Sequence, residues 1–164
     1  MSRSPSSAGP RWLDAGELKT WQWFTLLLNE LPHAMGRQLQ RDAQLSYLEY
    51  YVLAGLSDQA DHRMRMCDLA VLVNSEQSRL SHLVGRLEKR GFVRREPDPA
   101  DGRYMHAILT EAGYSHLREA APAHVEHVRE VVYDALDADE LRALRTISEK
   151  IVRRLGDRRP LNGE

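Results

Sequence analysis

Apolar residues recur at helical spacing along most of the chain. Over residues 15–41 they return every three or four positions and cover more than the stripe of about 100° with which a surface helix faces one core. We therefore expect a long first helix that turns part of its apolar surface toward another subunit. Pro32 lies inside this run and is expected to kink the helix, because proline removes a backbone donor and clashes with the preceding turn.

Three shorter elements are predicted next. Residues 46–58 form a second apolar run, in which Ser46 and Glu49 have the spacing of a capping box. Residues 64–66 suit a short extended piece, and residues 68–73 suit a short apolar helix. Either Asn74 or Ser75 then offers a cap for a further helix, which is predicted over residues 75–90 and ends at Gly91.

The helix over residues 75–90 has two distinct faces. Its inward positions are apolar and fall within a narrow arc: Leu80, Leu83, Val84 and Leu87. The opposite side and its flanks carry short hydroxyl groups, a histidine and long cationic groups, which suit close approach to base edges and phosphates: Ser75, Ser78, Arg79, Ser81, His82, Gly85, Arg86 and Lys89. On this helix alone, an ordinary solvated face explains the pattern equally well.

An alternating pattern follows Gly91. It predicts a strand over residues 92–96, a turn over residues 97–102 and a return strand over residues 104–109. Two helices followed by a hairpin make a winged helix, and Arg103 lies on the hairpin, where a minor groove or flanking phosphates would be. We expect Asp98 and Asp101 to brace this wing, for instance by pairing with Arg103.

The remaining pattern is helical again. Thr110 can cap a long helix that reaches about residue 136 and is bent by Pro122, and Asp137 with Glu140 opens a last helix. These helices and the first one carry more apolar surface than a small winged lobe can cover, so burial across a two-fold axis is expected.

The predicted fold class is mainly α (α+β), a winged helix-turn-helix lobe with a two-stranded wing between dimerisation helices. Its parts are a disordered leader at residues 1–11, an N-terminal dimerisation helix at 12–45, the DNA-binding lobe at 46–109, C-terminal dimerisation helices at 110–155 and a disordered tail at 156–164.

Composition narrows the functional classes only slightly. The chain has 164 residues, of which 42% are hydrophobic and 29% charged, which suits one soluble domain. We see no export signal and no apolar run of membrane-spanning length, so a cytoplasmic location without membrane contact is expected. The net charge of −1 argues mildly against a general nucleic-acid binder. Residues 79–103, however, hold seven Lys or Arg against four Asp or Glu.

Several stretches resemble the core of the MarR family of transcriptional regulators. They are residues 78–84 (SRLSHLV), 86–95 (RLEKRGFVRR), 98–103 (DPADGR) and 109–113 (LTEAG), and the resemblance extends over about residues 12–155. It implies an obligate homodimer that binds double-stranded DNA at a pseudo-palindromic operator and usually represses transcription. It also implies that a small phenolic or other aromatic ligand often releases the DNA.

The candidate DNA contacts combine this resemblance with the helix pattern. The resemblance places the wing arginine at Arg103 and the principal contacts of the recognition helix at Ser78, Arg79, His82 and Arg86. His82 departs from many members, which have arginine there, so their sequence preference cannot be transferred. The full candidate set is Ser75, Gln77, Ser78, Arg79, Ser81, His82, Arg86, Arg94 and Arg103.

Other residues invite further hypotheses. Trp21, Tyr50, Tyr51 and Met64 are candidates for an effector pocket, and core or dimer-interface packing explains them as well. Cys67, the single cysteine, is expected to be a structural thiol, with a redox-responsive regulator as the alternative.

The sequence contains few features that indicate a cofactor site or an enzyme. His124, His127 and Glu130 have helical spacing compatible with a metal site, but solvated side chains are the expected reading, and no metal or other cofactor is predicted. The chain has no phosphate-binding loop, nucleotide-binding glycine motif, metalloprotease motif or glycine-flanked serine, so we do not expect an enzyme. A winged helix that only binds protein is a second rival, which would need neither the polar helix face nor the wing arginine.

Overall fold

The computed structural model describes residues 9–156 and divides the chain into two compact units, residues 1–34 and residues 35–164. The expected disordered leader and tail lie, except for residues 9–11 and 156, outside the described residues. Helix α1 (Ala15–Ala43) contributes to both units. Among the described residues, no helix is both long enough and apolar enough to cross a membrane.

The first unit is the amino-terminal part of α1. Asp14 caps this helix, since its carboxylate accepts the backbone N–H groups of Gly16 and Glu17 at 2.8 Å each. Pro32 lies inside α1, which is α-helical on both sides of it. Most large apolar side chains of this part are exposed, whereas Phe24 and Leu31 are half-buried; the exposed ones are Leu18, Trp21, Trp23, Leu26, Leu27 and Leu28. They build no core of their own.

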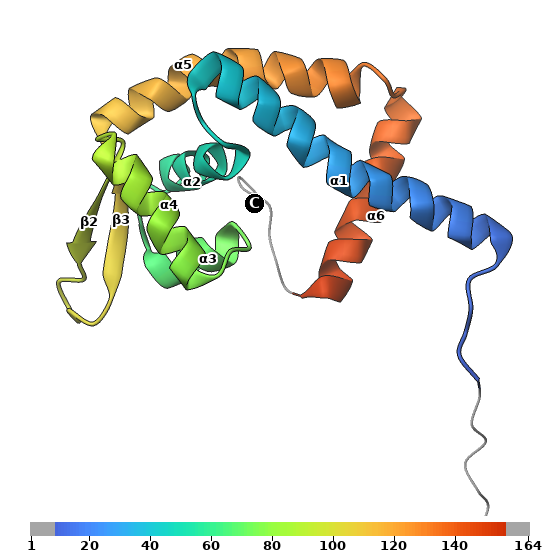
Figure 1. Ribbon diagram of the computed structural model, residues 1–164, viewed down its shortest axis with the longest axis horizontal. Coiled ribbons are helices and arrows are strands. Elements are labelled where there is room, and N and C mark those ends of the chain that lie inside the picture. Colours follow the sequence, from blue (N-terminus) through green and yellow to red (C-terminus); the bar gives the residue numbers. More distant parts are fainter. Residues whose placement is uncertain (1–8, 157–164) are drawn as a thin grey trace, which may run out of the picture. The chain divides into compact units, whose positions relative to one another are not determined.

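The second unit contains the winged lobe, formed by α2 (Tyr47–Ser57), α3 (Met66–Leu72), α4 (Gln77–Lys89) and a small sheet (Figure 1). The predicted capping box of α2 is confirmed: Glu49 N–H donates to Ser46 Oγ at 3.2 Å, and Ser46 N–H donates to Glu49 Oε2 at 2.9 Å. The predicted inward residues of α4 are confirmed as well, because Leu80, Leu83, Val84 and Leu87 are all buried in the lobe's core.

Helix α4 starts later than predicted. Its first residue is Gln77, and the N-cap is Glu76, which makes no capping hydrogen bond through its side chain among the described residues. The predicted caps at Asn74 and Ser75 were wrong. Asn74 instead takes a left-handed conformation with φ of 49° in the turn, and Ser75 Oγ turns to the Glu76 carbonyl oxygen at 3.4 Å. The predicted terminator Gly91 is confirmed, with φ of 76°.

The wing belongs to a three-stranded antiparallel sheet in the order β1-β3-β2, with β1 (Arg63–Arg65), β2 (Val93–Pro97) and β3 (Met105–Leu109). A two-stranded wing was expected; the third strand is β1, which pairs Arg63 with Ile108 and Arg65 with His106. Four of the five residues of β3 are buried, and a central buried strand needs ladder partners on both edges. The β2–β3 hairpin runs away from the start of α5 (Figure 1).

The carboxyl-terminal helices follow the wing. Helix α5 (Glu111–Val128) is capped by Thr110 as predicted, since Gly113 N–H donates to Thr110 Oγ1 at 3.1 Å. The helix does not stay regular to residue 136, because residues Arg129–Tyr133 form a π-helical segment that ends in a turn. Helix α6 (Ala138–Leu155) opens with the predicted capping box of Asp137 and Glu140, and none of its described residues is buried.

Candidate nucleic-acid interface

The outward face of α4 is an exposed polar surface of the winged lobe. Gln77, Ser78, Arg79, Ser81 and His82 are exposed on the first half of the helix. Within the described part of the chain, the side chains of Arg79 and His82 have no hydrogen-bond or ion-pair partner. The inner face of α4 is fixed in the core, and its outer face presents the hydroxyl groups of serines and the nitrogen donors of Arg79 and His82 to solvent. Ser75, before the helix, is half-buried.

Arg86 lies on the same helix but is engaged inside the lobe. Its Nε donates to Glu49 Oε1 at 3.2 Å, and the Glu49 side chain retains only 9% of its exposure. Arg90, one turn later, donates from Nη1 to the carbonyl oxygen of Gln44 at 2.8 Å. The second half of α4 and its C-cap are therefore tied to the first turn of α2 and to the connection before it.

The wing arginine is held by a single carboxylate. Arg103 donates to Asp101 from Nε at 2.9 Å and from Nη2 at 2.6 Å, while 85% of its side chain stays exposed. The hydrogen bonds from Arg103 hold the pKa of Asp101 below its ordinary value, and they raise the pKa of Arg103. The guanidinium is therefore charged, oriented and open to solvent.

Asp98 has a different partner from the one suggested by the sequence. It accepts the backbone N–H of Ala100 at 2.8 Å and pairs with Arg65 Nη2 at 3.0 Å, rather than with Arg103. The hydrogen bond from Ala100, followed by those from Asp101 and Arg65, lowers the pKa of this buried carboxyl. Asp98 thus joins the wing turn to β1, the strand that the sequence pattern placed outside the wing.

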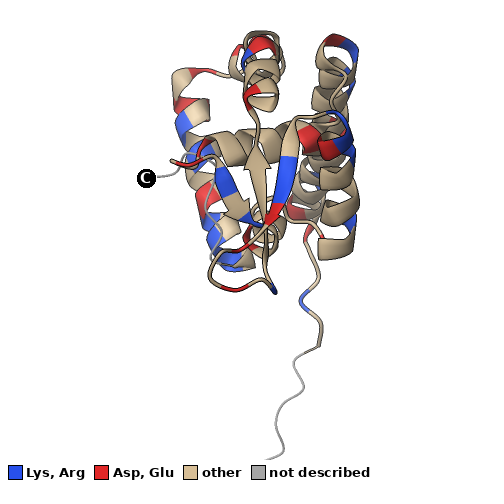
Figure 2. Cartoon of the chain, turned by 90° about the vertical axis from the view of Figure 1, so that its left-hand side faces the viewer, with Lys and Arg blue, Asp and Glu red and all other residues tan. Residues whose placement is uncertain are grey.

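The remaining arginines of the hairpin are also paired. Arg94 forms an ion pair with Glu96 on the same strand. Arg95 pairs with Glu88 of α4 at 2.6 Å, and this hydrogen bond lowers the pKa of Glu88. Basic and acidic positions consequently lie close together on the hairpin (Figure 2).

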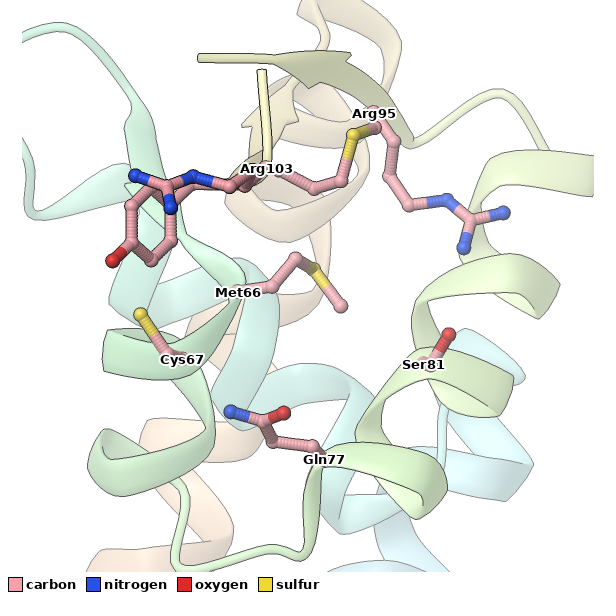
Figure 3. A pocket seen from close by; sticks show the side chains of 8 residues that line it. Met66, Cys67, Gln77, Ser81, Arg95 and Arg103 are labelled. Carbon is pink, nitrogen blue, oxygen red and sulfur yellow. The ribbon is translucent and has the colours of Figure 1, made fainter. Parts of the chain in front are cut away.

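A cavity of about 400 Å³ lies between α3, the first half of α4 and the wing (Figure 3). Ser81 and Arg95 lie on one side of it, and Cys67 and Arg103 lie on the other. The structure thus gathers three candidate DNA contacts, Gln77, Ser81 and Arg103, around one opening. The complete lining is Met66, Cys67, Gln77, Ser81, Arg95, Arg103, Tyr104 and Met105. The half-buried Cys67 thiol donates to Asp68 Oδ1 at 3.6 Å.

The candidate effector residues lie elsewhere. Trp21 is exposed and belongs to the first unit. In the second unit, the Tyr50 ring lies 4.5 Å from the His124 ring, the Tyr51 ring lies 5.3 Å from another tyrosine ring of α2, and Met64 packs against the lobe's core. Burial raises the pKa of Tyr50. None of these residues lines the cavity of Figure 3.

The histidines of α5 differ from the expectation of solvated side chains. His124 is buried, and its Nδ1 is hydrogen-bonded to Gln38 Oε1 at 2.9 Å, so burial lowers its pKa. His127 Nδ1 lies 3.6 Å from a Glu130 carboxylate oxygen. Sequence spacing missed the burial of His124 because the residue that covers it, Gln38, is 86 positions away. Over residues 9–156, no group of three His, Cys, Asp or Glu side chains is arranged to hold a metal ion.

Known proteins share this arrangement. A model of the MarR family matches residues 43–103. The chain is similar to Sco3205, a MarR family transcriptional regulator from Streptomyces coelicolor whose structure was solved in complex with DNA. The two are 39% identical with a TM-score of 0.87, over 95% of this chain and 100% of that chain. The chain belongs to the MarR family.

Further relatives agree with this assignment. AbsC, another MarR family regulator from Streptomyces coelicolor, is 36% identical over 89% of this chain and 98% of that chain, with a TM-score of 0.83. The transcriptional repressor MprA of Escherichia coli is 29% identical over 106 residues, which are 65% of this chain and 60% of MprA. This MarR family chain is a transcriptional regulator and not an enzyme, and the predicted mainly α winged-helix fold is confirmed.

Proposed function

We propose that this chain is a homodimeric repressor that binds a pseudo-palindromic DNA operator. The observation that carries the proposal is the exposed face of α4, on which Arg79 and His82 lie without partners in the described structure, next to a wing arginine held in place by Asp101. The DNA in the Sco3205 structure supports the same function for a relative of this chain.

In this proposal the two exposed elements have different roles. Helix α4 enters the major groove, where Arg79 and His82 contact base edges and the hydroxyl groups of Ser78 and Ser81 allow close approach. Arg103 contacts the backbone or the minor groove beside it. Because Asp101 already fixes the guanidinium, little side-chain entropy is lost when Arg103 meets DNA.

The apolar faces of the terminal helices support the dimer. In α6, Ile147 is 53% exposed, and Leu144, Ile151, Val152 and Leu155 are exposed beside it. A helix with this much open apolar surface and no buried residue of its own is stabilised by a partner. A second copy that covers these faces across a two-fold axis would set two α4 helices about 34 Å apart, one turn of DNA.

Operator binding is tested with DNA selected from a random pool by the purified protein. Affinity is then measured by fluorescence anisotropy at several salt concentrations. We expect a steep loss of affinity with rising salt, because each neutralised phosphate contributes about 0.9 to the slope of log K against log salt. A binding constant that is flat with salt would contradict a DNA-binding function.

Single substitutions then separate the two roles. Arg103→Ala should weaken binding to all sequences and reduce the salt slope by about 1, whereas Arg79→Ala and His82→Ala should change the preferred sequence. Arg153→Ala is the matched control, because this arginine is 81% exposed on α6 and pairs only with the adjacent turn. If Arg103→Ala binds like the control, the wing is not a contact.

A further inference from the structure

The ion pair between Glu49 and Arg86 joins two elements that the proposed function treats separately. Glu49 is in the first turn of α2, and Arg86 is on the recognition helix α4, 37 positions later. The pair is asymmetric, since the Glu49 side chain is 9% exposed and that of Arg86 is 58% exposed. Arg86 thus reaches from the surface of α4 down to a carboxylate fixed inside the lobe.

The two carboxylate oxygens of Glu49 have separate functions. Oε2 accepts from Ser46 N–H at 2.9 Å and from Ser46 Oγ at 3.0 Å, which closes the capping box of α2. Oε1 accepts from Arg86 Nε at 3.2 Å. The cap therefore fixes the orientation of the carboxylate, and the carboxylate in turn fixes the orientation of the guanidinium.

A second hydrogen bond, from Arg90, also holds α4 in place. Arg90 lies one turn after Arg86 and donates to the backbone oxygen of Gln44, immediately before the α2 cap. The apolar contacts on the inner face of α4 are not directional, so they resist separation better than they resist small rotations or slides. Two directional bonds limit those movements: Arg86 of α4 binds the first turn of α2, and Arg90, the C-cap of α4, binds the connection between α1 and α2.

We propose that Glu49, acting through Arg86, is a positioning residue that sets the pose of the recognition helix on DNA. The inference rests on the proposed DNA-binding function, and it changes the role of Arg86, which sequence pattern and family resemblance both made a direct contact. A displacement of about 1 Å at a recognition surface is enough to lose well-aligned contacts. Arg79 and His82 are the side chains whose placement depends on this bond.

The charge of Glu49 makes the two roles of Arg86 separable. Glu49→Gln keeps an oxygen for the Ser46 cap and removes the anion that faces Arg86. If Arg86 contacts DNA directly, this change frees the guanidinium and removes a negative charge near the phosphates, so affinity should stay equal or rise. If Glu49 positions α4, Glu49→Gln should lower the affinity for DNA, although the loss of a negative charge alone would raise it.

The experiment is a double-mutant cycle on the selected operator with Glu49→Gln, Arg86→Met and the two combined. We expect each single variant to weaken binding about five-fold, the scale of a partly exposed ion pair, and the combined variant to be no weaker than either. The salt slope of Glu49→Gln should equal that of the unmodified protein, because no phosphate contact is lost. Urea unfolding of every variant verifies that the fold is intact.

Ser46→Ala is the control for the α2 cap. It removes the Ser46 hydroxyl, but the Ser46 backbone N–H still donates to Glu49 Oε2 at 2.9 Å and keeps the carboxylate facing Arg86. The variant should therefore lower stability and leave operator affinity unchanged. The inference is overturned if Glu49→Gln binds as tightly as the unmodified protein or tighter, if the two effects simply add, or if Ser46→Ala weakens binding as much as Glu49→Gln. An unmodified protein that selects no DNA would instead overturn the proposed function.

Discussion

Replacing Gly113 by alanine should destabilise the protein, although alanine is the better helix former. Gly113 is buried in the first turn of α5, where a Cβ would lie 2.1 Å from the backbone oxygen of Phe92 and 2.9 Å from Leu109 Cδ1. The leucine can rotate away. The Phe92 oxygen cannot easily move, because it accepts the backbone N–H of Thr110 at 3.0 Å. Either the start of α5 or the start of the wing must therefore shift.

The expected magnitude is the difference between two effects. Overpacking that shifts backbone costs about 3 kcal/mol, at the upper end of the usual range. Alanine returns about 1 kcal/mol through helix propensity and a less flexible unfolded chain. The free energy of unfolding should thus fall by about 2 kcal/mol, which urea denaturation followed by circular dichroism measures directly. The protein concentration is held constant, because the stability of the proposed dimer depends on it.

Gly85 is the matched control. It lies in the middle of α4, and a Cβ there would meet only Arg95 Nη2 at 4.0 Å, an ordinary contact. Gly85→Ala should therefore raise the free energy of unfolding by about 0.5–1 kcal/mol, the usual difference between the two residues inside a helix. A Gly113→Ala variant that unfolds at the same urea concentration as Gly85→Ala would refute the steric reasoning.

Three further outcomes are expected. Arg103 lowers the pKa of Asp101, so the ion pair between Asp101 and Arg103 is intact above the ordinary pKa of 3.8 and is lost as pH falls through the lowered pKa. The NMR signal of Arg103 Nε–H should therefore stay unchanged from pH 7 to 3.8 and broaden below pH 3.8. Burial raises the pKa of Tyr47 from 10.0 to about 12, so between these two values the folded state keeps a proton that the unfolded state releases. The free energy of unfolding should therefore fall as pH rises from 10 to 12, and the fall should be smaller in Tyr47→Phe. Ile147→Glu should sediment as a monomer, and the exposed control Arg153→Ala should sediment as a dimer. If both variants sediment as dimers, α6 does not form the proposed dimer interface.

Local sequence patterns predicted the elements and their faces correctly where the causes are local. The capping boxes at Ser46 and Asp137 need only residues three positions apart, and the inward residues of α4 follow from the helical period. The late start of α4 was missed because Asn74 and Ser75 each suit an N-cap by residue type. Asn74 instead takes the left-handed position that ends α3, where Ser75 N–H donates to the Ala70 carbonyl oxygen at 2.9 Å, and α4 starts only after this turn.

The pairing of Asp101 with Arg103, two positions apart, was predicted, but the partners of other charged residues were not, because those partners are distant in the chain. Periodicity places Arg86 on the outer flank of α4, but it cannot show that Glu49 lies within 3.2 Å of it. Asp98 and Arg65 are 33 positions apart and meet only because β1 joins the sheet beside β3. Sequence could therefore identify the exposed polar face that we propose meets DNA, whereas the structure separates the side chains that are free from those that are engaged.

The pairing of most arginines with carboxylates lowers the long-range attraction that the lobe can exert on DNA. The basic excess of residues 79–103 suggests attraction of DNA at long range, but Arg86 and Arg103 each face a carboxylate, and the hairpin arginines do too. Paired charges cancel beyond a Debye length of about 10 Å and act only at contact. With a net charge of −1, the chain should bind unrelated DNA weakly. In the proposed function, specificity depends on the placement of a few free donors, Arg79 and His82, which is the reason that a positioning bond at Glu49 would matter.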